Sequence, residues 1–175
     1  MPEFIDIVKL RRSVRRYRPD PVPRKSIEKC LEAARHAPTA CDTQSWRFIV
    51  TQGGLKDRIA KECLGELPVP NSWASEAPVI VVMASARDLL THRIGARIKG
   101  TNYELIDAGI AGEHFVLQAA ELGLGTCWLG WFKKKKIRKL LDLQAGGDIT
   151  ALITMGYPEG EINEKNRKPL EEIRE

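Results

Sequence analysis

The sequence has few cysteines, and they are not spaced to act together. The four are Cys30, Cys41, Cys63 and Cys127, with no C-x-x-C pair and no histidine at a metal-ligand interval. This spacing argues against a metal site, and we expect free thiols, buried or on the surface. The 175-residue chain can enclose a core without disulfides, so we expect one domain over residues 1–175.

The sequence also lacks a long apolar run. No segment approaches the ~18 apolar residues that a transmembrane helix needs. The first residues, MPEFIDIVKLRR, carry acidic side chains where a signal peptide has basic ones, and no continuous apolar stretch precedes a small-residue cleavage site. We therefore expect a cytoplasmic protein that does not enter a membrane.

Basic residues are in excess but are not gathered in one long stripe. The net charge is +5, and 28 lysines and arginines are spread among 23 acidic residues. The one dense run, Lys133–Lys136, opens a helical pattern, and we interpret it as a solvated helix face rather than a nucleic-acid patch. We expect no nucleic-acid partner, because a local anion site explains the excess equally well.

Hydrophobic periodicity and helix-breaking residues predict the secondary structure. We expect helices over 4–10, 24–37, 55–65, 103–122 and 133–142, and strands over 46–52, 79–84, 126–132 and 148–158. The continuous apolar run 79–84 indicates a central strand buried on both faces. Helices and strands do not alternate as regularly as a doubly wound fold requires, so we expect an α+β fold. Residues 159–175 are too polar to form a core element.

Three segments carry groups that suit a phosphorylated aromatic ligand. In the first, R-x-S-x-R at 11–15, guanidinium groups and a hydroxyl suit a phosphate monoester, although a basic surface segment is the alternative. The second, APTACDTQSW at 37–46, is a loop of small polar residues that can approach a flat ligand, or a plain connection. We interpret its Trp46 as a core anchor.

The third segment, GLGTCWLG at 123–130, is rich in glycine but does not match a dinucleotide-binding fingerprint. That motif requires strand, glycines and helix in this order, whereas here the glycines follow a helix and precede a strand. The sequence also lacks the motifs of P-loop nucleotide hydrolysis, zinc proteolysis and serine hydrolysis. We interpret His114, in the apolar helix, as a hydrogen-bonded core histidine rather than a catalyst.

In combination, five blocks resemble the nitroreductase family of flavoproteins over nearly the whole chain. They are RRSVRRY at 11–17, APTACDTQSWRFIV at 37–50, AAELGLGTCWLG at 119–130, MGYPE at 155–159 and NRKPLEEI at 166–173. The resemblance implies a three-layer α+β sandwich with a mostly antiparallel central sheet flanked by helices. It also implies a homodimer with shared cofactor sites, in which the long helix packs across the two-fold axis and a C-terminal arm, about 159–175, extends to the partner.

The resemblance further implies an FMN-dependent oxidoreductase. NADH or NADPH would reduce the flavin, and a nitroaromatic, quinone or similar small acceptor would then oxidise it in ping-pong turnover. The flavin carries the chemistry, so no catalytic side chain and no metal are implied.

The implied FMN-binding residues fall into four groups along the chain. They are Arg11, Arg12, Ser13 and Arg15 at the phosphate; Pro38, Thr39, Ala40, Asp42 and Gln44 in a loop from the other subunit; Asn71, Leu129 and Gly130 at the ring; and Lys165, Arg167 and Lys168 from the C-terminal segment.

Two residues depart from the family pattern, and other functions stay open. Asp42 stands where the family has Asn, which removes an amide donor and adds a negative charge near an anionic cofactor, while Ser45 replaces a proline. One alternative keeps the flavin fold for reductive dehalogenation or flavin fragmentation, and residues 87–102, expected to cover the site, would decide it. Another is a non-catalytic module that binds FMN or nucleic acid.

Overall fold

The computed structural model describes residues 3–64, 71–85, 101–143, 148–160 and 165–174. Its helices are α1 (Phe4–Leu10), α2 (Arg24–Arg35), α3 (Gly53–Ile59), α5 (Tyr103–Glu121) and α6 (Lys134–Leu140). Its strands are β1 (Trp46–Gln52), β2 (Val79–Ser85), β3 (Gly125–Leu129) and β4 (Ile149–Gly156). Every predicted helix and strand is present, and the differences lie at the ends. The largest is in β3, because the predicted strand 126–132 ends at Leu129.

Shorter helical segments lie between these elements. A π-helical segment, Ala60–Leu64, directly follows α3, and 3-10 helices cover Ala40–Asp42, Ser72–Ser75 and Leu170–Glu172. The predicted helix 55–65 is therefore α3 together with the π-helical segment.

The four described strands form one sheet in the order β1-β2-β4-β3. Each neighbouring pair is antiparallel: β1 with β2, β2 with β4, and β3 with β4. The register of β1 on β2 runs from Trp46 opposite Ser85 to Gln52 opposite Val79. The expected antiparallel central sheet is thus confirmed.

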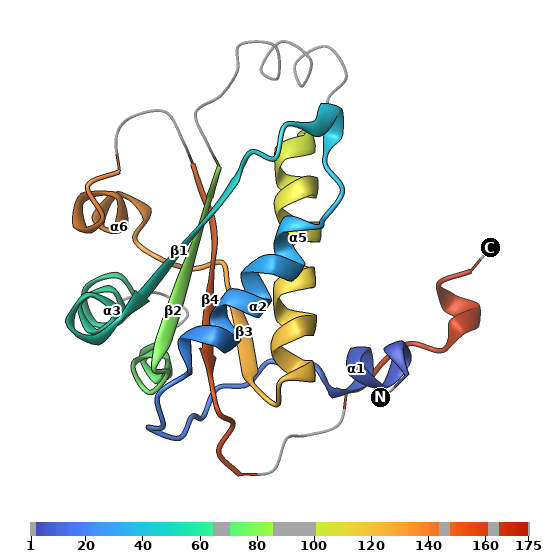
Figure 1. The fold of residues 1–175 in the computed structure, drawn as a ribbon, viewed down its shortest axis with the longest axis horizontal. Coiled ribbons are helices and arrows are strands. Elements are labelled where there is room, and N and C mark those ends of the chain that lie inside the picture. The colour runs from blue at the N-terminus through green and yellow to red at the C-terminus, as the bar shows by residue number, and fades with distance from the viewer. Residues whose placement is uncertain (1–2, 65–70, 86–100, 144–147, 161–164, 175) are drawn as a thin grey trace.

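Helices cover both faces of the sheet, as Figure 1 shows, and give it three layers. Val79, Val81 and Met83 of β2 pack with α2 and α5, because alternate side chains of a strand point to the same face. Ile80 and Val82 pack on the other face with α3, the π-helical segment and α6. All seven residues of β2 are buried, which confirms a central strand enclosed on both sides.

The long helix α5 packs against the sheet but keeps part of its apolar surface exposed. Ala111, Phe115 and Ala119 are fully buried. Leu105 and Ile106, in its first turn, are 54% and 48% exposed. The all-round apolar pattern of the sequence therefore reflects one buried side and, at the first turn, apolar side chains that remain exposed.

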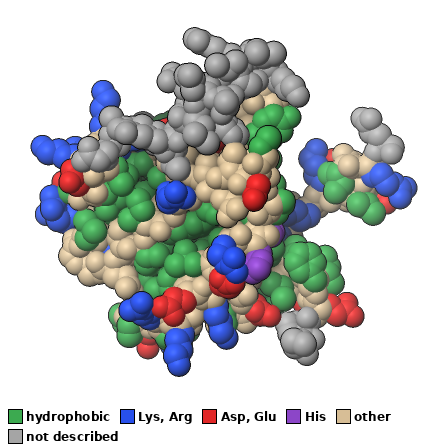
Figure 2. All heavy atoms as spheres, turned by 45° about the horizontal axis from the view of Figure 1, so that its top comes forward, with side chains coloured by type: hydrophobic (Ala, Val, Ile, Leu, Met, Phe, Trp, Pro, Cys, Tyr) green, Lys and Arg blue, Asp and Glu red, His purple; other side chains and the backbone are tan. Residues whose placement is uncertain are grey.

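The beginning of the C-terminal segment contacts α1 near the N-terminus of the chain. Lys165 Nζ donates a hydrogen bond to the carbonyl oxygen of Val8 at 2.6 Å. From there the C-terminal segment runs away from the body, and Figures 1 and 2 show it standing clear of the sheet and helices. Leu170 and Ile173 in this segment are 58% and 70% exposed. Among the described helices, none has the length and apolarity required to cross a membrane.

Candidate functional site

The basic segment after α1 is fixed to the sheet by backbone hydrogen bonds. Val14 donates its N–H to the carbonyl oxygen of Thr126 in β3 at 2.9 Å, and Ser13 forms a parallel bridge with Thr126. Val14 lies directly over Gly125, where an added Cβ would be 2.7 Å from Val14 Cγ2. The close approach requires glycine at this position. The segment therefore has a defined position relative to β3.

Tyr17 fixes the far end of the same segment. Its hydroxyl donates to the carbonyl oxygen of Val14 at 2.7 Å and lies 2.7 Å from the Thr154 hydroxyl of β4. Burial, the largest cause, raises the pKa of Tyr17, so the phenol stays protonated and available for these bonds. Residues 14–17 are thus held at both ends.

Three of the candidate phosphate-binding residues act electrostatically on the Cys127 thiol. Burial raises the pKa of Cys127, while Arg15, a hydrogen bond from Ser13 and Arg11 act in the opposite direction. The Arg15 guanidinium lies 5.8 Å from the Trp73 ring centre. This stacking, which sequence reasoning missed, orients Arg15 without neutralising it.

Arg11, which acts on Cys127, also acts on Lys165 in the C-terminal segment. Desolvation lowers the pKa of Lys165, and the charges of Arg11, Arg12 and Arg167 lower it further. The charges of Arg11, Arg12 and Arg167 therefore act on Lys165, and the Glu113 carboxylate acts on it in the opposite direction. Lys168 instead pairs with Glu172 at 3.2 Å within the C-terminal segment.

This cluster, defined as Arg11, Arg12, Ser13, Arg15, Lys165 and Arg167, has the chemistry of a phosphate site. Guanidinium groups bind phosphate oxygens bidentately, and an ammonium and a hydroxyl add single donors. Glu113 is the carboxylate paired with Arg11, at 3.6 Å, and it is half exposed. A bound dianion would relieve the mutual repulsion of the cations.

The loop after α2 has an unusual backbone conformation. Cys41, Asp42 and Gln44 have φ values of 53°, 52° and 46°, a region that residues other than glycine rarely adopt. Gln44 Nε2 donates to Asp42 Oδ1 at 2.8 Å, so the Gln44 amide supplies a donor beside the carboxylate that replaces the family's Asn. Asp42, Gln44 and Pro38 are exposed, and Thr39 and Ala40 are partly buried.

The loop is tied to α5 by Asp107, which sequence reasoning overlooked. Asp107 Oδ2 accepts hydrogen bonds from Thr39 Oγ1 at 2.9 Å and from the Ala40 N–H at 3.0 Å. An acidic residue between the apolar residues Leu105, Ile106 and Ala108 was the available signal.

The remaining candidate residues lie at the ends of other elements. Asn71 is buried and donates through Nδ2 to the Trp131 carbonyl oxygen at 3.3 Å. Leu129 is the buried last residue of β3, and Gly130 follows it with open space where a side chain would project. Residues 86–100, most of the stretch expected to cover the site, lie outside the described part of the chain.

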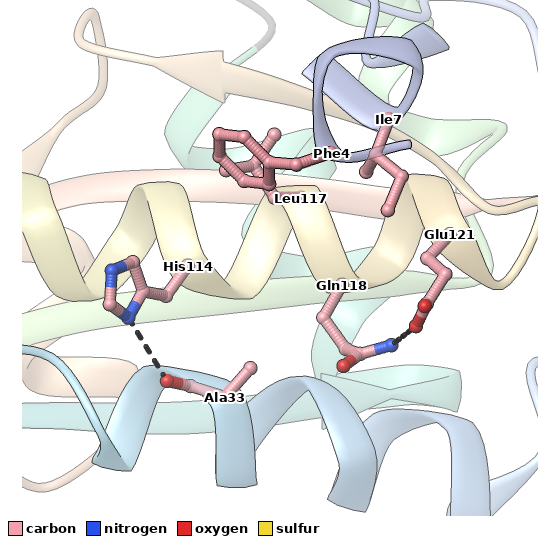
Figure 3. A pocket seen from close by; sticks show the side chains of 7 residues that line it. All are labelled: Phe4, Ile7, Ala33, His114, Leu117, Gln118 and Glu121. Carbon is pink, nitrogen blue, oxygen red and sulfur yellow. Dashed lines mark hydrogen bonds between the residues drawn. The ribbon is translucent and has the colours of Figure 1, made fainter. Parts of the chain in front are cut away.

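The interpretation of Trp46 is confirmed, whereas that of His114 holds for its hydrogen bond only, because His114 is partly buried at the surface and not in the core. Trp46 is 9% exposed and packs with Ala37 and Ala111, as expected of a core anchor. His114 Nδ1 lies 3.2 Å from the Ala33 carbonyl oxygen, which joins α5 to α2 (Figure 3).

A surface groove of about 210 Å³ lies between α1, α2 and α5. Figure 3 shows Phe4 of α1 over Leu117, with His114 farther along α5. The lining residues are Phe4, Ile7, Ala33, His114, Leu117, Gln118 and Glu121. None of them is a candidate cofactor residue, so the groove and the cation cluster are different features.

The cysteines are free thiols, as expected. Cys30, Cys63 and Cys127 are buried and Cys41 is exposed. Burial raises the pKa of Cys30 to about 12. In the described part of the chain, no group of three metal-binding side chains gathers at one place.

Comparison with known sequences places these features in a family. Residues 8–157 match the model of the nitroreductase family. A protein named NADH dehydrogenase from Thermus thermophilus is 31% identical over an alignment that covers 93% of this chain and 90% of the relative. A protein named FMN reductase (NAD(P)H) from Bacillus subtilis is 26% identical, over 99% of this chain and 73% of the relative.

Solved structures share the fold. A nitroreductase family protein from Clostridium difficile 630 superimposes with a TM-score of 0.85 at 28% identity, covering 99% of this chain and 98% of that one. A structure described as an FMN-dependent nitroreductase from Clostridium difficile R20291 gives a TM-score of 0.75 at 27% identity, over 93% and 91%.

Proposed function

The chain belongs to the nitroreductase family, and on that premise we propose that it is a cytoplasmic FMN-dependent oxidoreductase that takes electrons from NADH or NADPH. Its acceptors are nitroaromatics, quinones or similar small molecules. Donor and acceptor use the same cavity in turn, which gives ping-pong kinetics. The relatives named FMN reductase and FMN-dependent nitroreductase support the cofactor and the donor.

The observation that carries the proposal is the cation cluster built from both ends of the chain. Desolvation and the positive charges of Arg11, Arg12 and Arg167 lower the pKa of Lys165, an effect that the Glu113 carboxylate opposes. Such an arrangement costs free energy unless an anion compensates it. The phosphate of FMN, with close to two negative charges, is the anion that this donor set fits.

The residues of this chain bind and orient the cofactor. Arg11, Ser13 and Arg15 would bind the phosphate from the segment fixed on β3, and Lys165 and Arg167 would bind it from the C-terminal segment. Gly130, which carries no side chain, lets the backbone after β3 approach the ring edge. FMN, when bound, supplies the hydride chemistry, and the nearby cations and backbone donors stabilise negative charge on the reduced ring.

A second subunit completes each site. We assign the loop with Pro38, Thr39, Ala40, Asp42 and Gln44 to the flavin held by the partner's cation cluster. Most of the exposed large apolar residues support a dimer, because they lie on α1, at the start of α5 and on the C-terminal arm: Phe4, Ile5, Leu10, Leu105, Ile106, Leu170 and Ile173. The partner covers these residues and the groove between α1, α2 and α5.

Optical spectroscopy on the purified protein tests the function. We expect a yellow protein whose flavin absorbance bleaches anaerobically on addition of NADH or NADPH and returns when a quinone or nitroaromatic is added. Plots of rate against donor at several acceptor concentrations should give parallel lines in double-reciprocal form. A colourless protein that fails to take up added FMN would refute the proposal.

A further inference from the structure

Asp107 is a buried acidic side chain that joins the long helix to the loop after α2. It is 5% exposed, and its neighbours in the sequence of α5 include the buried Ala108 and Ala111. Its Oδ2 accepts from Thr39 Oγ1 at 2.9 Å and from the Ala40 N–H at 3.0 Å. Buried polar groups need such partners, so the loop itself satisfies the carboxylate.

The loop that Asp107 holds would not keep its conformation by backbone preference alone. Positive φ angles at Cys41, Asp42 and Gln44 persist only where the surroundings over-determine them. The Thr39 hydroxyl, which donates to Asp107, also accepts the Gln44 N–H at 3.1 Å. A continuous set of hydrogen bonds therefore runs from Asp107 through Thr39 to Gln44 and spans all three left-handed residues.

We propose that Asp107 is a positioning residue that fixes residues 39–44 in the conformation in which this loop meets the flavin of the partner subunit. The inference rests on the proposed function, which assigns the loop to that flavin. Asp107 acts through Thr39 and Ala40, and neither FMN nor a substrate needs to touch it.

The geometry provides a conservative and a disruptive variant at the same position. Both hydrogen bonds end on Oδ2, so Asp107→Asn can place its amide oxygen there and keep both. Asp107→Leu has a similar size and keeps neither. Val116→Ala is the matched control, because Val116 is fully buried on the same helix and packs in the core between helices and sheet.

The first measurement is amide hydrogen exchange over residues 39–44 in FMN-free protein. We expect exchange of the Ala40 and Gln44 amides to accelerate at least about tenfold in Asp107→Leu, because the Ala40 N–H loses its acceptor and the Thr39 hydroxyl, which accepts the Gln44 N–H, loses its anchor. Asp107→Asn should stay within about threefold of the wild type at these amides. Val116→Ala should lower the melting temperature without selective acceleration in this loop.

The second measurement is the dissociation constant of FMN, determined by quenching of flavin fluorescence. We expect a rise of at least about tenfold in Asp107→Leu and recovery to within about threefold in Asp107→Asn. Val116→Ala should leave the constant close to that of the wild type at a temperature where it is folded. A role in stability alone would not produce this rescue by Asn.

The outcomes separate the inference from the function it rests on. Unchanged loop exchange in Asp107→Leu would show that the carboxylate does not anchor the loop and would overturn the inference. Accelerated exchange with unaltered FMN affinity would overturn the positioning role. Failure of the wild type to bind FMN would refute the proposed function before any variant is compared, and the positioning role would fall with it.

Discussion

At the scale of single residues, neighbouring arginines in the basic segment have different surroundings. Arg15 lies over Trp73, whereas Arg16 is 75% exposed and approaches Glu159 at 3.9 Å. Their positions along the chain are adjacent, and their side chains have the same charge. Substituting each arginine in turn therefore distinguishes the effect of its local position on FMN binding from the effect of net charge.

Substitution of Arg15 by Gln should weaken FMN binding selectively. Loss of a charged hydrogen bond costs about 1.5–3 kcal/mol, which corresponds to a dissociation constant raised roughly 10- to 150-fold. Arg16→Gln removes the same charge next to it and should change the constant less than about threefold. Fluorescence titration at fixed salt measures both. An equal loss of FMN affinity in the two variants would mean that the net charge of the segment, and not the position of Arg15, determines binding.

Thiol reactivity should distinguish the four cysteines. At pH 8 we expect one of the four thiols, the exposed Cys41, to react quickly with Ellman's reagent in FMN-free protein. Burial raises the pKa of Cys30 to about 12 and also raises the pKa of Cys63 and Cys127, so these stay protonated and shielded. All four should react in denaturant, and Cys41→Ser should abolish the fast phase. Fast reaction of a second thiol would contradict the described packing.

At the scale of elements, the position of the basic segment depends on its contact with β3. Gly125→Ala would place a Cβ 2.7 Å from Val14 Cγ2 and 2.8 Å from Val14 Cβ. We expect a loss of about 1–3 kcal/mol in the free energy of unfolding, measured with urea, because overpacking moves the backbone. FMN affinity should fall as well, since residues 13–15 shift with Val14.

Gly54→Ala provides the control for this substitution. Gly54 lies in α3, with nothing within 4 Å of an added Cβ, so alanine should leave stability equal or slightly higher and FMN binding unchanged. If Gly125→Ala behaved in the same way, the close contact with Val14 would not position the phosphate-binding residues.

Most elements, but fewer of the site contacts, could be predicted from the sequence. The bounds of β1 and α1 match the prediction. Aromatic and β-branched residues indicate the strand, apolar residues at helical spacing indicate the helix, and all of these signals lie within the segment itself or directly beside it. The convergence of Lys165 with Arg11 followed only from family resemblance. The anchoring of the loop by Asp107 escaped prediction, because its partners are 67 and 68 residues away in the sequence.

The backbone of the 39–44 loop also escaped prediction for a physical reason. Positive φ is expected at glycine, yet here it occurs at Cys41, Asp42 and Gln44. Tertiary hydrogen bonds impose it, and no local propensity signals them.

At the scale of the whole molecule, the arm that stands clear of the body should join two subunits. We expect the double variant Leu170→Asp and Ile173→Asp to raise the dimer dissociation constant by roughly 100-fold or more, since each side chain loses about 1.5–3 kcal/mol of apolar burial. FMN affinity should fall with it, because each site needs two subunits. Sedimentation velocity over a concentration series, with flavin absorbance followed, measures both.

Glu171→Ala supplies the control for the arm, because Glu171 is exposed in the same 3-10 turn and carries no apolar group to bury. It should sediment and bind FMN as the wild type does. A wild-type protein that sediments as a monomer with FMN bound would rule out sites shared between subunits.

Because the cation cluster contains residues from both ends of the chain, it can form only after the C-terminal segment has been translated. Arg15 is translated roughly 150 residues before Lys165, a delay on the order of 10–30 s at typical rates of protein synthesis. Throughout that interval the nascent chain contains the N-terminal phosphate-binding residues but lacks Lys165 and Arg167. Loading of the coenzyme is therefore expected after release of the finished polypeptide, so that cells short of riboflavin would accumulate full-length apoprotein rather than stalled translation products.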